Sequence, residues 1–107
     1  MPTEITIRVL LLKGQESWIA QGLEYNIAAQ GDTVREAKEA FLQAVVGQIA
    51  IDRQFGQEAL EGISPAPREY WEQFEEAERV PDPVELPEGI TPGFMIPSIN
   101  QDFRVYA

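Results

Sequence analysis

The sequence contains neither cysteine nor histidine. Without cysteine there can be no disulfide, no thiol nucleophile and no cysteine-rich zinc site, and without histidine the commonest general base and histidine-containing metal sites are missing. Carboxylate chemistry is the only catalytic chemistry left. We therefore expect a protein that is not an enzyme and that uses no metal or cofactor.

Basic residues are also scarce: Lys and Arg total 8 against 18 Asp and Glu, so the net charge at pH 7 is −10. Phosphate neutralisation needs clustered cations, and here the eight are scattered, so direct binding of nucleic acid is not expected. The acidity is compatible with a basic protein partner, but solubility alone explains it as well.

No apolar run approaches the length needed to span a bilayer, and no segment has the pattern of a signal peptide. Membrane association is not expected, and the absence of cysteine fits a cytoplasmic location. The length of 107 residues, with 44% apolar content, suits one compact domain with a short appendage.

The first part of the chain has strand patterns followed by a helix pattern. Apolar residues alternate over 5–12, a polar break at 13–16 suits a hairpin loop, and 17–23 would return antiparallel. A short extended segment at 27–29 precedes a helix that begins at about Thr33. The sequence thus predicts an α+β fold in which a long helix packs a small antiparallel three-stranded sheet, in the order β-β-β-α.

The predicted helix has clear signals at both ends. Gly31 supplies backbone freedom, and Thr33 with Glu36 forms a capping box that satisfies two backbone N–H groups of the first turn. Gly56 is a plausible end. The apolar stripe that would face the sheet consists of Val34, Ala37, Phe41, Ala44, Val45 and Ile49.

The run from Trp18 to Phe41 carries a Trp-X-Ala strand and then Gln-Gly-Asp-Thr leading into a helix with Glu-Ala. In this run the chain resembles the HicB-like antitoxin family. The matching residues are Gln30, Gly31, Asp32, Thr33, Glu36 and Ala37. The bend Leu23 to Asn26 departs from the Leu-Pro-Gly-Cys that the family usually has, so the chain looks like a divergent member. The resemblance covers roughly Ile5 to Gly47.

The resemblance implies a partial RNase H fold and a protein without catalytic activity that neutralises a small basic HicA-like toxin, which cleaves mRNA. Many members also carry a DNA-binding segment for autoregulation, but no basic helix pair follows the main helix here. The alternative is an orphan HicB-like domain that forms homo-oligomers or a scaffold and has no toxin. A metal-dependent nuclease would need Glu24, Asp32 and Asp52 to approach one another, and the first strand contributes no carboxylate.

Beyond the HicB-like part (1–63), the chain predicts an amphipathic acidic helix within 64–80, running from about Arg68 to Arg79, and a proline-rich tail (81–107). The aromatic stripe of the helix packs in the core or contacts a partner. The tail either wraps its own domain or ends in a strand, Phe103 to Tyr106, added to a sheet edge of this chain, a second copy or a partner. The candidate partner-binding residues are Trp71, Glu72, Phe74, Glu75, Glu76, Phe103 and Tyr106.

Overall fold

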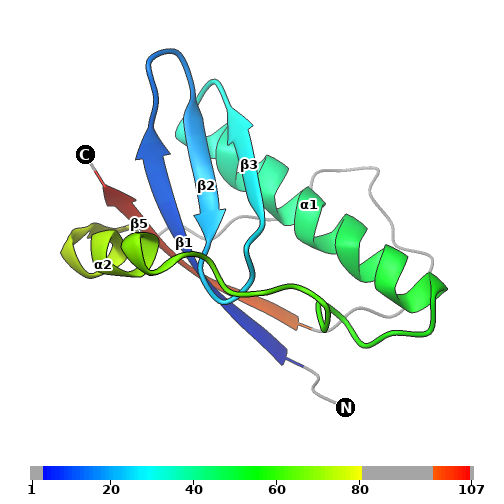
Figure 1. Cartoon of the computed structure of the whole chain (residues 1–107). Coiled ribbons are helices and arrows are strands. Elements are labelled where there is room, and N and C mark those ends of the chain that lie inside the picture. Colours follow the sequence, from blue (N-terminus) through cyan, green and yellow to red (C-terminus); the bar gives the residue numbers. More distant parts are fainter. Residues whose placement is uncertain (1–3, 81–97, 107) are drawn as a thin grey trace.

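A computed structural model describes residues 4–80 and 98–106 as an α+β fold (Figure 1). Two helices pack on a mixed sheet. The elements in chain order are β1 (Glu4–Lys13), β2 (Trp18–Gly22), β3 (Ala28–Gly31), α1 (Val34–Gln54), α2 (Arg68–Glu76), β4 (Glu78–Val80) and β5 (Ser98–Tyr106). The predicted class and the predicted β-β-β-α order of the first part are confirmed.

The sheet has the strand order β3-β2-β1-β5-β4. β1, β2 and β3 form the expected antiparallel half. The prediction of a three-stranded antiparallel sheet was nevertheless incomplete, because β5 pairs parallel to β1 and β4 pairs antiparallel to β5. The apolar pattern of β1 correctly indicated a central strand, but a pattern along one strand does not say which distant segment lies on its second side.

The tail therefore ends in a strand on this chain, and this strand lies inside the sheet. Its register with β1 runs from Ser98 opposite Glu4 to Tyr106 opposite Leu12. The predicted extended path of the tail between Val80 and Ser98 lies outside the described residues. Strands from the predicted parts 1–63, 64–80 and 81–107 all belong to one sheet.

The start of α1 follows the predicted capping box with one difference. The Thr33 hydroxyl accepts the backbone N–H of Glu36 at 3.1 Å, but the Glu36 carboxylate accepts the N–H of Asp32, at 2.9 Å. The backbone freedom predicted for Gly31 is not used, because its φ is not positive; glycine is needed there for space, since a Cβ would lie 2.5 Å from the backbone nitrogen of Ala37. At the other end, Gly56 has a φ of +72°, as the predicted helix end requires.

The second helix is shorter than predicted. It ends at Glu76, and Ala77 is already extended, so the prediction of helix as far as Arg79 was wrong. Residues Glu78–Val80 instead pair with β5. The restriction that Pro81 places on Val80 also favours extended backbone at this point. Of the helices in the described part of the chain, neither has the length and hydropathy to cross a bilayer.

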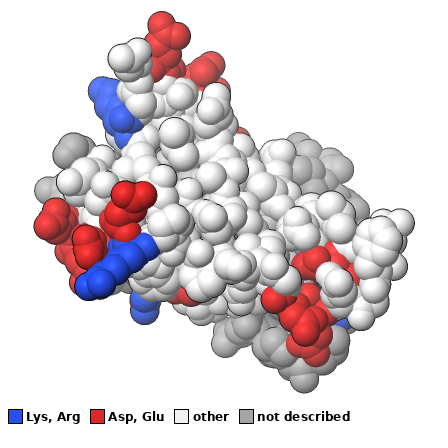
Figure 2. All heavy atoms as spheres, in the orientation of Figure 1, with Lys and Arg blue, Asp and Glu red and all other residues white. Residues whose placement is uncertain are grey.

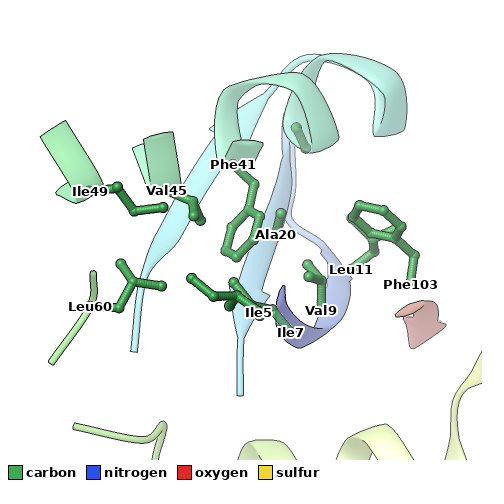
Figure 3. Close-up of a cluster of buried hydrophobic side chains, with 11 residues drawn as sticks. Ile5, Ile7, Val9, Leu11, Ala20, Phe41, Val45, Ile49, Leu60 and Phe103 are labelled. Carbon is green, nitrogen blue, oxygen red and sulfur yellow. The ribbon is translucent and has the colours of Figure 1, made fainter. Parts of the chain in front are cut away.

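The two helices cover opposite faces of the sheet. On the α1 face, Phe41, Val45 and Ile49 point toward the odd-numbered residues of β1, as Figure 3 shows. The buried residues of this cluster are Ile5, Ile7, Val9, Leu11, Ala20, Ala37, Phe41, Val45, Ile49, Leu60 and Phe103. A smaller cluster on the other face joins Leu10 and Leu23 to Ala66 and Phe74 beneath α2.

Candidate protein-binding surface

Helix α2 presents a row of carboxylates outward while its aromatic side packs on the sheet. Phe74 is buried, and the half-buried Trp71 donates its indole N–H to the carbonyl of Ala66 at 3.2 Å. The backbone N–H of Ala66 in turn donates to the carbonyl of Leu23 at 2.8 Å. These contacts fix the start of α2 to the bend after β2 and thereby set the direction of its acidic side.

The exposed acidic residues of α2 are Glu69, Glu72, Glu75 and Glu76. Figure 2 shows acidic atoms gathered over this helix, at the left of the molecule. Glu72 lies 3.2 Å from the Arg68 guanidinium, in a pair so exposed that water screens most of its attraction. Within the described part of the chain, Glu69, Glu75 and Glu76 have no ion-pair partner. The outer side of α2 is therefore a strongly acidic surface, which we call the α2 surface.

The aromatic candidate residues do not belong to the outer, acidic side of α2. Phe74 and Phe103 are only 3% and 2% exposed, and they pack on opposite faces of the sheet. Trp71 and Tyr106 are half-buried against the smaller cluster. The aromatic stripe of α2 therefore packs against the sheet, as one of the two predicted alternatives had it. Among the seven candidate residues, the three glutamates are the exposed ones.

Two arginines next to α2, Arg8 and Arg104, make contacts within the chain. The Arg8 guanidinium lies 3.6 Å from the Glu24 carboxylate and 5.5 Å from the centre of the Trp71 ring. Arg104 stacks 4.3 Å from the Phe74 ring and donates to the Phe74 carbonyl at 3.2 Å. Pairing with Glu24 neutralises the Arg8 charge, whereas Arg104 keeps its positive charge on the inner side of α2, away from the exposed carboxylates.

Two further basic residues follow the same pattern. The Arg35 guanidinium pairs with Glu39 at 3.2 Å, one helical turn away. Lys38, buried in α1, holds its ammonium 4.9 Å from the Phe103 ring. Phosphate binding requires several outward-facing cations on one surface, and of these two residues of α1 only Arg35 is exposed.

The three carboxylates of the nuclease alternative lie in separate places. Asp32 precedes α1 and Asp52 lies near its end, so most of the helix, about 27 Å, separates them. Asp52 is buried and accepts hydrogen bonds from Leu60 N–H at 2.7 Å and from the Gln48 amide at 3.0 Å. Glu24 pairs with Arg8. Within residues 4–80 and 98–106, no group of three acidic residues is arranged to hold a metal ion.

Sequence reasoning missed an exposed apolar pair at the end of α1. Ile51 is 50% exposed and Phe55 is 72% exposed. Both lie off the stripe that faces the sheet, and their spacing of four residues places them on adjacent turns of one helix side. This spacing was visible in the sequence, but only the observed end of α1 shows that no described element covers these side chains.

Comparisons with known proteins gave no match. No protein-family model, curated protein or solved structure matches the chain. The HicB-like resemblance, carried by residues 30–37, therefore stays a prediction.

Proposed function

We propose that this chain is a non-catalytic protein-binding domain of the HicB type that neutralises a small basic HicA-like toxin. The residues that carry the resemblance occupy one continuous structural unit. Gln30 and Gly31 end β3, Asp32 and Thr33 form the turn, and α1 begins beside them. The proposal thus concerns a defined strand, turn and helix start.

The observation that carries the proposal is the α2 surface. Its carboxylates are exposed, whereas Arg8 and Arg35 are paired with glutamates of the same chain and Arg104 is held under the helix against Phe74. A concentration of one charge sign on one surface attracts a partner of the opposite sign and orients it during encounter. Such attraction raises the association rate and falls with salt, while buried contacts set the lifetime of the complex.

A growth assay tests this function. In the host genome, a neighbouring gene for a small basic protein would be expressed alone and together with this chain. We expect growth arrest with the basic protein alone and recovery on co-expression. Recovery should weaken when Glu72, Glu75 and Glu76 are replaced together by glutamine. A basic neighbour whose toxicity is unchanged by this chain would contradict the proposal.

The second candidate is an orphan HicB-like domain that assembles with copies of itself. The divergent bend favours this candidate. Leu23 is fully buried; its backbone N–H donates to the Arg8 carbonyl, and its own carbonyl accepts the N–H of Ala66. The Asn26 N–H donates to the Ser64 carbonyl at 2.7 Å. The bend thus serves to attach the segment before α2. Sedimentation of the purified chain separates the candidates, because an orphan domain would form a defined oligomer without any partner.

A further inference from the structure

The outer side of α1 carries an apolar patch at its C-terminal end, formed by Gly47, Ile51 and Phe55, which we call the α1-end patch. The three residues are spaced by four, so they lie on successive turns of one side of the helix. Ile51 and Phe55 are the two large hydrophobic side chains that stand exposed among the residues whose burial the structure describes.

Gly47 makes this side of the helix open. A Cβ at Gly47 would meet no atom of the described residues within 4 Å, so none of these neighbours requires glycine at this position. The glycine is exposed in the middle of a helix, where it is about 1 kcal/mol less favourable than alanine. Its absence of a side chain leaves the helix backbone beside Ile51 accessible to close approach.

We propose that the α1-end patch is the apolar anchor for the basic protein partner, with Phe55 inserted into a pocket of that partner whose rim carries Lys or Arg. This inference rests on the proposed function and adds a second contact, distinct from the α2 surface. Aromatic residues, Phe among them, are enriched at the cores of protein interfaces.

Exposed carboxylates in the loop after α1 outnumber the one basic residue of the last helical turn, the half-buried Arg53, and favour a cationic partner. The loop after α1 carries the exposed Glu58 and Glu61, and Figure 2 shows acidic atoms in this region at the lower right. Asp52 holds this loop against the end of α1 through Leu60 N–H, and the Asp52 carbonyl accepts the N–H of Gln57 at 2.8 Å. The charge beside Phe55 is therefore fixed in position.

A second copy of this chain fits the patch less well. Two copies would each bring a net charge of −10 to the contact. The repulsion between two acidic copies favours an occupant that contributes positive charge around the apolar contact.

Site-specific photo-crosslinking in the native host tests the inference. Benzoylphenylalanine, a photoreactive aromatic probe, would stand in place of Phe55, Glu72 or the control Gln43, and adducts would be identified by mass spectrometry. We expect an adduct at position 55 with a small protein rich in Lys and Arg, and none at position 43. With that protein purified, Phe55→Ser should weaken Kd at least about tenfold, and the matched Gln57→Ser should leave it unchanged.

Three outcomes overturn the inference. An adduct between two 12.0 kDa copies at position 55 would make the patch a self-association contact. A basic adduct at position 72 alone, with Kd insensitive to Phe55→Ser, would leave the proposed function standing and exclude the patch. The absence of any basic partner at all three positions would remove the proposed function together with this inference.

Discussion

The two faces of the sheet are built differently. On the α1 face, aliphatic and aromatic side chains fill a continuous core from Ile5 to Leu11 along β1. On the α2 face, the apolar cluster is small, and the cations Arg8 and Arg104 extend it by stacking on Trp71 and Phe74. The difference indicates that the α1 face supplies most of the stability, whereas the α2 face fixes an acidic helix in place.

The largest expected loss of stability comes from removing a buried phenylalanine, and its size should differ between the two faces. Phe41→Ala should lower the free energy of unfolding by about 3–5 kcal/mol, because Phe41 is fully buried in the main core. Phe74→Ala should cost less, about 2–3 kcal/mol, since α2 can detach while the sheet stays folded. Urea unfolding measures both values.

Hydrogen exchange sharpens the same comparison. Phe74→Ala should raise amide exchange in α2 and leave α1 protected. Loss of protection throughout the sheet in that variant would show that the two faces form one cooperative unit, against our account.

The next effect concerns Asp52, which fastens the loop after α1 to the main core. Asp52→Ala should destabilise the fold by about 2–3 kcal/mol, because it leaves the buried N–H of Leu60 without its acceptor. Thermal unfolding monitored by circular dichroism gives the comparison with Asp32→Ala, an exposed control at the other end of α1. Equal losses in the two variants would exclude a role for this buried hydrogen bond.

Arg104 tests the contribution of stacked cations to the α2 face. Arg104→Ala should cost about 1–2 kcal/mol, since it removes both the contact with the Phe74 ring and the hydrogen bond to the Phe74 carbonyl. Arg35→Ala is the matched control, because the Arg35 side chain is 87% exposed. Chemical denaturation of both variants should show a clear loss for Arg104 alone. A loss of similar size for Arg35 would argue against the stacked arrangement.

The smallest effect in the series is at the helix cap. Thr33→Ala should lower stability by about 1 kcal/mol through loss of the hydrogen bond to Glu36 N–H. Thr33→Ser keeps the hydroxyl and should restore most of the difference in the midpoint of urea unfolding. No rescue by serine would mean that the cap hydrogen bond is not the cause.

Local patterns predicted the α1 face well. The alternation of β1, the cap at Thr33 and the helix end at Gly56 are all set by neighbouring residues, and each is observed. The position of β5 beside β1 was not predictable in this way, because a pairing between residues 94 positions apart, such as Glu4 and Ser98, leaves no local pattern.

Of the candidate surface, the sequence predicted the features that depend on local spacing and missed those that depend on tertiary structure. The acidic side of α2 follows from its helical spacing, and Glu72, Glu75 and Glu76 are exposed as that spacing requires. The burial of Phe103 depends on the place of β5 in the sheet, and the exposure of Phe55 depends on where the rest of the chain passes. Both are tertiary properties.

Native mass spectrometry of the tagged protein, purified from its own host at low salt, tests the central claim most directly, because it reports partner mass and copy number together. We predict a stoichiometric complex with a small basic protein that dissociates as salt is raised. Recovery of the chain alone, or only with copies of itself, would contradict the account.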